Sequence, residues 1–311
     1  MSFCCMLALA GRATCKKSYT DKVDPSPMKS AAIISKPSKP ELAGVLPELL
    51  SWFRKRGYHL YLDQETARYT DGEEVVLRKA IGAKHPDFAL VLGGDGTLLS
   101  AARAVAHEGV SILAVNLGSL GFLTEVPLSE MYATLEAVDA GNCPVEQRSV
   151  LDCRLIRGGE CIAHHFALND AVVNKSAISR LVDFDLLIDG IFVFNYKADG
   201  VIVATPTGST AYSLAAGGPV LMPSVTSFVV TPVCPHSLTH RPLVVTDKAQ
   251  IELRVETGGE EAFLSIDGQV GVPVKQGDRV LCQRAEHTVK LLRMKKTFFD
   301  VLRNKLKWGQ R

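Results

Sequence analysis

The apolar positions in the first half of the chain alternate between two periods. Short apolar runs typical of buried strands are followed by segments in which apolar residues recur every three or four positions, as on one face of a helix. This alternation predicts a parallel sheet with helices on both faces. The expected strands are 31–34, 58–62, 88–92 and 112–115, and the expected helices are 42–53, 97–107 and 128–138, the last with Ser129 as its N-cap.

After Pro144 the period changes to two. Residues 182–188 alternate between apolar and polar side chains, and Asp189-Gly190 then turns the chain into a second apolar run. Gly158-Gly159 and Asp267-Gly268 have the composition of further hairpin turns. The second part of the chain is therefore expected to be mostly β, with antiparallel sheets packed together.

These changes of pattern divide the chain into four segments. Met1 to Pro27 lacks periodicity, and Met28 stands just before the first strand as an alternative start. Helical spacing returns at 297–306, so the end of the chain is expected to pack back on the first domain. The expected segments are a disordered extension (1–30), an α/β domain (31–142), a β-rich domain (143–284) and a C-terminal tail (285–311).

Composition narrows the class of protein. Lys and Arg number 35 and Asp and Glu 33, so the net charge of +2 gives no strong field for nucleic acid. No stretch of eighteen apolar residues is long enough to span a bilayer. The eight cysteines form no CxxC pair, which favours reduced thiols in a soluble, cytoplasmic protein.

A glycine-rich turn follows the expected strand 88–92. Gly93-Gly94-Asp95-Gly96-Thr97 leads directly into a helix, an arrangement in which backbone N–H groups and the helix dipole attract an anion. Asp95 would repel a phosphate, so this carboxylate either caps the helix or accepts a proton from an attacking hydroxyl. The sequence contains neither a Walker lysine loop nor GxGxxG.

Two further polar segments interrupt apolar strands. Thr205 to Ser213 concentrates hydroxyl groups around Gly208, either as a self-capped connection or as a loop that recognises a nucleotide. Asn169 and Asp170 separate two apolar runs, and a buried polar pair there needs partners. These residues alone leave a strand edge and a ligand contact as alternatives.

The motifs, taken together, resemble one family. Gly93 to Thr97 matches the GGDGT signature shared by NAD kinases with diacylglycerol and sphingosine kinases. The later segments, in order, are similar to those of NAD kinases of the bacterial type, from about Ala31 to Trp308. Ser35-Lys36-Pro37 departs from the family's usual glycine-containing first loop. The segments that carry the resemblance are Asn116 to Thr124, Asn169-Asp170, Asp199-Gly200, Thr205 to Ser213, Pro235 to Leu238, Arg241 to Leu243 and Asp267 to Gln269.

The resemblance implies a reaction and a site. ATP would donate its terminal phosphoryl group to the 2′-hydroxyl of the adenosine ribose of NAD, giving NADP and ADP, with Asp95 as proton acceptor. A divalent cation, Mg²⁺, would serve as cofactor, and the chain would form a homo-oligomer, a dimer or a tetramer. The implied contacts to the dinucleotide are Asp95, Gly96, Asn169, Asp170, Arg180, Lys197, Asp199, Thr210, Ala211, Tyr212, Ser213, Leu214, Ala215 and Gln269.

Two other functions share some of these features. A lipid kinase carries the same GGDGT turn, but it leaves Thr205 to Ser213 and Asp267 to Gln269 unexplained. A non-catalytic NAD-binding protein would keep the cleft without the chemistry, although it has no need of Asp95.

Overall fold

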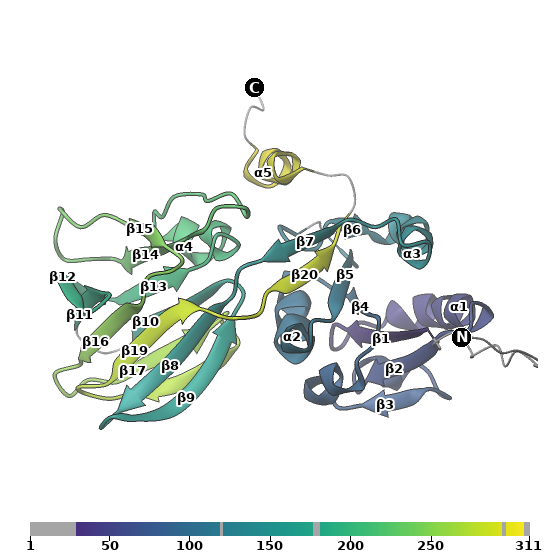
Figure 1. The fold of residues 1–311 in the computed structure, drawn as a ribbon, viewed down its shortest axis with the longest axis horizontal. Helices are drawn as coiled ribbons and strands as arrows, with labels where there is room; N and C mark the ends of the chain where they lie inside the picture. Colours follow the sequence, from purple (N-terminus) through teal and green to yellow (C-terminus); the bar gives the residue numbers. More distant parts are fainter. Residues whose placement is uncertain (1–28, 119–120, 177–180, 294–296, 308–311) are drawn as a thin grey trace, which may run out of the picture.

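The first domain is an α/β layer structure (Figure 1). The computed structural model describes residues 29–118, 121–176, 181–293 and 297–307, so the expected extension lies almost entirely outside the described residues. An eight-stranded sheet has the order β3-β2-β1-β4-β5-β20-β7, with β6 paired to β5. Its strands are β1 (Ser30–Ser35), β2 (His59–Asp63), β3 (Glu74–Val76), β4 (Phe88–Leu92), β5 (Ser111–Asn116), β6 (Val126–Pro127), β7 (Val145–Arg148) and β20 (Val289–Leu292).

Helices cover both faces of this sheet, as the alternating pattern predicts. Alternate residues of β1 explain why: Ala31 and Ile33 pack in one buried cluster with α1 and α3, and Ala32 and Ile34 pack in another with α2. The helices are α1 (Leu42–Lys55), α2 (Asp95–Val105) and α3 (Met131–Asp139), with short 3-10 turns η1 (Thr66–Tyr69), η2 (Arg78–Ala80), η3 (Gly82–Lys84), η4 (Ala106–Glu108) and η5 (Leu128–Glu130).

Two helix starts differ from the expected ones. Ser129 is not the N-cap of α3, because residues 128–130 first form the 3-10 turn η5 and the helix begins at Met131 behind Glu130. The helix after the glycine turn begins at Asp95 rather than at Thr97. Asp95 and Gly96 therefore belong to the first helical turn.

The second domain consists of two packed antiparallel sheets, as the period of two predicts. The first has the order β15-β14-β13-β10-β17-β18 and the second β12-β11-β16-β19-β8-β9. Their strands are β8 (Leu151–Arg157), β9 (Glu160–Ala167), β10 (Asp170–Lys175), β11 (Val182–Ile188), β12 (Ile191–Ala198), β13 (Gly200–Ala204), β14 (Ser227–Val233), β15 (Leu243–Thr246), β16 (Ile251–Glu256), β17 (Ala262–Ile266), β18 (Val270–Val274) and β19 (Arg279–Arg284).

The core of the β domain lies between the two sheets. Phe184, Leu253 and Val280 from one sheet pack with Val173 and Phe228 from the other, and all five are buried. Burial of large apolar side chains on both inner faces holds the sheets together, at about 25 cal/mol per Å² of apolar surface removed from water. The outer face of β10, β13 and β14 is covered near Ala216 and Leu221, where a 3-10 turn η6 (Gly208–Thr210) and a short helix α4 (Tyr212–Ala215) form.

The two domains are joined twice. β7 pairs antiparallel with β20, and β20 pairs parallel with β5, so the chain on both sides of the β domain returns to the first sheet. The sequence analysis had placed the residues of β7 in the β-rich domain (143–284), and the domain boundaries remain an expectation. After β20, α5 (Phe298–Leu306) starts with a capping box between Thr297 and Asp300. In the part of the chain that is described, no helix is long and apolar enough to cross a bilayer.

Candidate active site

The glycine turn lies between the end of β4 and the start of α2. Every residue of β4 is buried, and the N–H of Gly93 donates to the Val115 carbonyl at 2.9 Å. A Cβ atom at Gly93 would lie 2.4 Å from Thr97 Oγ1, so only glycine fits there. Gly94 is the N-cap and its carbonyl accepts from Thr97 N at 2.9 Å. The N-terminus of α2, with the positive end of its dipole, therefore lies at the glycine turn, which suits an anion.

Asp95 is held by the turn at residues 121–124. Its Oδ1 accepts from Thr124 N at 3.0 Å, from Thr124 Oγ1 at 2.9 Å and from Leu123 N at 3.1 Å. Its Oδ2 accepts from Phe122 N at 2.8 Å. Four donors from one turn fix the orientation of the carboxylate, and a carboxylate oxygen with one donor can accept another.

The same turn is anchored to the end of β5. Asn116 Nδ2 donates to Thr124 Oγ1 at 2.7 Å, and Asn116 Oδ1 accepts from Gly118 N at 2.6 Å. Gly121 N donates back to the Thr124 carbonyl at 3.2 Å. The motif from Asn116 to Thr124 thus builds a cradle whose donors meet at Asp95.

The alternative in which Asp95 caps its own helix is wrong. Gly94 occupies the N-cap position, and α2 has no side-chain cap. The carboxylate instead reaches across to the neighbouring turn. The sequence could not show this, because the donors lie 27 to 29 positions away along the chain.

A pocket of about 370 Å³ lies on the β domain beside this turn. Gln269 joins the two features, since its Nε2 donates to the Gly96 carbonyl at 2.8 Å. Four of the expected site residues line the pocket: Asn169, Asp170, Ala211 and Tyr212. The other residues that line it are Val172, Asn174, Ser265, Asp267 and Gly268.

Two buried carboxyl groups give the pocket its electrostatic character. Burial, together with the charge of nearby Asp267, raises the pKa of Asp170 to about 7. Burial also raises the pKa of Asp267, although backbone N–H groups and the Arg103 guanidinium act in the opposite direction. Asp170 can therefore donate a hydrogen bond as an acid or accept one as a carboxylate near neutral pH.

Asp267 is one of two site residues that sequence analysis did not name as such. It was read as part of a hairpin turn and of the Asp267 to Gln269 motif, without a role of its own, but its carboxylate accepts from Asn169 N at 2.7 Å and from Leu168 N and Asp170 N at 3.2 Å each. It thereby fixes the backbone that carries both expected polar residues. Its place beside Gly268 and Gln269 in a shared motif was the available signal.

Arg103 was also not anticipated. Its Nη1 donates to Asp267 Oδ2 at 3.2 Å, and its Nη2 donates to Gln269 Oε1. Because Arg103 belongs to α2, this pair of contacts fastens the helix that carries Asp95 to the hairpin of the β domain. Both polar atoms of the Gln269 amide therefore form hydrogen bonds, Oε1 with Arg103 and Nε2 with the Gly96 carbonyl.

The expected residues 210–215 divide into two groups. Ala211 and Tyr212 line the pocket, and Tyr212 as a whole residue is 42% exposed. Ser213 is buried, with its Oγ 2.9 Å from Thr231 Oγ1. Its side chain therefore contacts β14 and is not part of the pocket lining. Thr210 Oγ1 donates to the Thr207 carbonyl at 3.2 Å. Leu214 and Ala215 follow in α4 and are not part of the pocket lining.

The remaining expected contacts lie farther from the pocket. Asp199 accepts from Lys175 N through its carbonyl and pairs with Lys175 Nζ at 3.0 Å, one residue beyond pocket-lining Asn174. Lys197 lies on β12, in the other sheet, with its side chain 58% exposed and 4.0 Å from Asp183. Arg180 lies outside the described residues.

A mostly parallel α/β sheet that presents a Gly-Gly-Asp-Gly-Thr turn to a polar pocket on a β domain is the architecture of a phosphoryl-transfer enzyme acting on a nucleotide. Two family models match, the ATP-NAD kinase N-terminal domain over residues 31–143 and the ATP-NAD kinase C-terminal domain over residues 168–294. The chain belongs to the ATP-NAD kinase family.

The chain is similar to two NAD kinases and to an NADH kinase of known structure. An NAD kinase of Koribacter versatilis is 64% identical over 284 residues, which is 91% of this chain and all of that protein. An NAD kinase of Acidobacterium capsulatum is 51% identical over 285 residues, again 91% of this chain and all of that protein. The crystal structure of yeast NADH kinase complexed with NADH aligns with a TM-score of 0.83 at 25% identity, covering 92% of this chain and 90% of that one.

Proposed function

We propose that this NAD kinase transfers the terminal phosphoryl group of ATP to the 2′-hydroxyl of the adenosine ribose of NAD, with Asp95 as the proton acceptor. The observation that carries the proposal is the setting of Asp95. It stands at the start of α2, and among the described residues its Oδ2 has one donor, the N–H of Phe122, while Oδ1 has three, two backbone N–H groups and the Thr124 hydroxyl. Oδ2 is therefore the atom that we assign to the ribose hydroxyl.

The chemistry follows from this assignment. A ribose hydroxyl is a poor nucleophile at neutral pH, and a positioned carboxylate assists by taking its proton as the new O–P bond forms. The bond between the γ-phosphorus and the bridging oxygen breaks in the same transfer, and ADP leaves with that oxygen. The N–H groups at the start of α2 and the glycine turn favour the negative charge of the phosphates.

We assign NAD recognition to the pocket of about 370 Å³. Asp170 has a pKa of about 7, so it can exchange hydrogen bonds with sugar hydroxyls in either protonation state. Tyr212 offers a partly exposed ring for stacking and a phenol for hydrogen bonding. Asn169 and Asn174 add amide donors and acceptors.

A divalent cation, Mg²⁺, is the cofactor that we propose. The described residues contain no group of three His, Cys, Asp or Glu side chains that could hold a metal by themselves. Mg²⁺ keeps several waters and binds through substrate phosphates in kinases, so it would come with ATP and offset the charge of the transferring group.

We further propose that the enzyme is cytoplasmic and self-associates into a dimer or a tetramer. Cys153 and Cys282 are free thiols in the described structure, which agrees with a reducing compartment. Ile191, Phe192 and Val193 are exposed on β12, an edge strand of its sheet. Light scattering on the purified chain tests the subunit number.

The central experiment is a coupled assay. Purified chain with ATP, Mg²⁺ and NAD should yield NADP, detected by an NADP-specific dehydrogenase, and omission of Mg²⁺ should stop the reaction. Reactions with NADH in place of NAD, and with other phosphoryl donors, define the substrate range. Absence of NADP from a folded protein that binds both nucleotides would refute the activity.

A further inference from the structure

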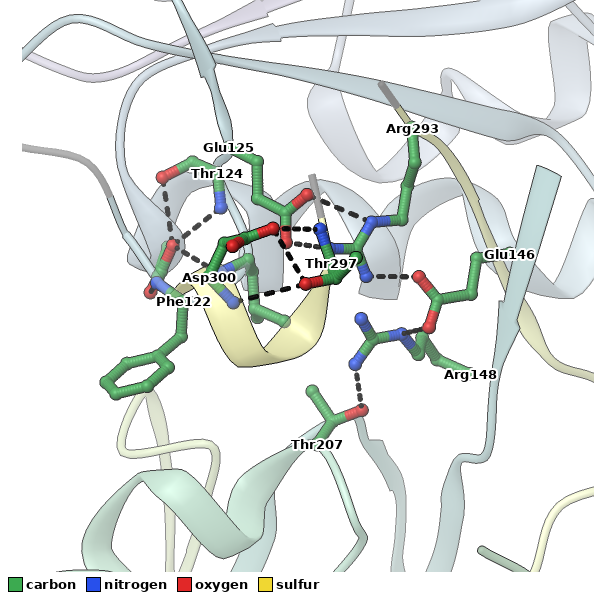
Figure 2. Close-up of polar contacts among 11 residues, drawn as sticks. Phe122, Thr124, Glu125, Glu146, Arg148, Thr207, Arg293, Thr297 and Asp300 are labelled. Carbon is green, nitrogen blue, oxygen red and sulfur yellow. Dashed lines mark hydrogen bonds and ion pairs between the residues drawn. The ribbon is translucent and has the colours of Figure 1, made fainter. Parts of the chain in front are cut away.

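Four charged side chains form a continuous chain of ion pairs outside the pocket. They are Glu125, Arg293, Glu146 and Arg148, called here the ion-pair chain. Arg293 Nε donates to Glu125 Oε2 at 3.1 Å, and the two side chains make a second contact through Nη2. Arg293 Nη1 donates to Glu146, whose other oxygen lies 3.1 Å from Arg148 Nε. Figure 2 shows these residues in one line of contacts.

Each end of the ion-pair chain meets a loop of the site. Glu125 directly follows Thr124, which donates twice to Asp95. At the other end, Arg148 Nη1 donates to Thr207 Oγ1 at 3.2 Å. Thr207 stands in the turn that continues to Ala211 and Tyr212 in the pocket lining.

The turn that carries Thr207 has little freedom to move by itself. A Cβ atom on Gly208 would lie 2.0 Å from the Asn169 carbonyl, so the turn lies directly against the start of β10. Thr205 Oγ1 donates to the Leu168 carbonyl at 2.6 Å and accepts from Gly208 N at 3.1 Å. A displacement of Thr207 would therefore also move the parts of the pocket lining that contain Tyr212 and Asn169.

Burial of these charges calls for an explanation. The side chains of Arg148, Glu125 and Arg293 are 3%, 6% and 12% exposed. Buried ion pairs of this kind are often replaceable by apolar residues without loss of stability, because desolvation offsets the attraction. What apolar residues cannot supply is the directional pairing of a planar guanidinium with two carboxylates.

We propose that the ion-pair chain positions the turn that holds Asp95 relative to the turn that carries Tyr212, with Arg293 and Arg148 as positioning residues for the reaction. Arg293 lies at the end of β20, where its N–H donates to the Pro144 carbonyl at 3.0 Å. The β20–β7 pair thus provides the base from which both arginines reach their loops. The inference rests on the proposed function, since that function assigns Asp95 to the ribose hydroxyl of NAD and Tyr212 to the pocket that binds NAD.

Two conservative variants break the ion-pair chain at different places. Arg293→Lys keeps the positive charge but cannot serve two carboxylates as a planar fork. Thr207→Val removes only the hydroxyl at the loop end. Each should lower kcat/KM for NAD by about 10- to 100-fold, the usual effect of misplacing reacting groups by a fraction of an ångström to an ångström. Because both act on one connection, the double variant should lose no more than the worse single variant.

Arg157→Lys is the matched control. Arg157 also pairs in a fork with a buried carboxylate, Asp278, at 2.9 and 2.7 Å, but in the β domain between β8 and the turn before β19. It should lose comparable thermal stability and keep its kinetic constants. Equal kinetic losses in the control, additive losses in the double variant, or full activity of Arg293→Lys would each overturn the proposal.

Calorimetric titration with NAD separates this proposal from the activity itself. If the wild-type chain makes no NADP, the proposed function fails, yet NAD affinity in the same variants still reports on the pocket. Weaker NAD binding in Arg293→Lys and Thr207→Val than in Arg157→Lys supports the ion-pair chain. Identical affinity in all three variants refutes it.

Discussion

Gly121 leaves the space that the Asp95 carboxylate occupies. A Cβ atom at Gly121 would lie 1.9 Å from Asp95 Oδ1 and 2.4 Å from Thr124 Oγ1. The four donors to Asp95 can therefore converge only because residue 121 has no side chain. The relationship joins two sequence motifs that are 26 positions apart into one structural unit.

Replacement of Gly121 by alanine should displace this carboxylate. We expect Gly121→Ala to lower turnover by about 100-fold, because a shift of roughly an ångström at a catalytic group has that effect. Gly118→Ala is the matched control in the same turn, since among the described residues a Cβ atom there would approach only Asn116 Oδ1, at 3.9 Å. Steady-state kinetics and melting curves of both variants test this. Normal turnover in Gly121→Ala would show that the carboxylate position is unimportant.

Asp95→Asn tests the proton acceptor directly. The change keeps the size of the side chain and one acceptor oxygen but removes the charge and the basicity. The chemical step should slow by about 10²–10⁴-fold, the usual contribution of a general base, while NAD and ATP still bind. Single-turnover rates with nucleotide titrations provide the measurement. Near wild-type turnover would leave Asp95 only the role of holding the turn at residues 122–124.

Tyr212→Ala tests the assignment of the pocket. Loss of a stacking or hydrogen-bonding contact should weaken NAD binding by about 1–3 kcal/mol. The Michaelis constant for NAD should rise accordingly, while that for ATP serves as the internal control. A variant that folds normally and shows equal changes for both substrates would place NAD elsewhere.

Asp170 predicts a pH dependence of stability. Its pKa is raised to about 7 in the folded protein, mainly by burial, so the folded state keeps a proton that the unfolded state has lost above about pH 4. The free energy of unfolding should therefore fall as pH rises from about 4 to about 7 and then stop changing through this group. Asp170→Asn should flatten this part of the profile.

The control for this profile is Asp183→Asn, which changes a half-exposed carboxylate on β11. Urea unfolding of the three proteins between pH 4 and pH 8 provides the comparison. Asp183→Asn should follow the wild-type curve. An Asp170→Asn profile parallel to that of the wild type would mean that Asp170 is ionised throughout this range.

The sequence by itself determined the elements and the family. Strands such as 88–92 and 182–188 are specified locally, because their apolar periodicity matches the burial that a strand in a sheet requires. The glycine turn at Gly93 was equally readable, since its steric requirement arises from Thr97, four residues away. Motifs of this kind can be recognised in a sequence, because the residues that impose their geometry are close neighbours along the chain.

Only the tertiary structure decided which side chains meet. The partners of Asp95 lie 27 to 29 positions away, Asp267 meets Leu168 to Asp170 across 97 to 99 positions, and Arg103 meets Asp267 across 164. Ser213 matched the same motif as Tyr212, but the turn directs it into the core instead of the pocket. Hydrogen bonds and desolvation act over a few ångströms in space, and no local period of the sequence encodes which distant segments the sheets bring that close.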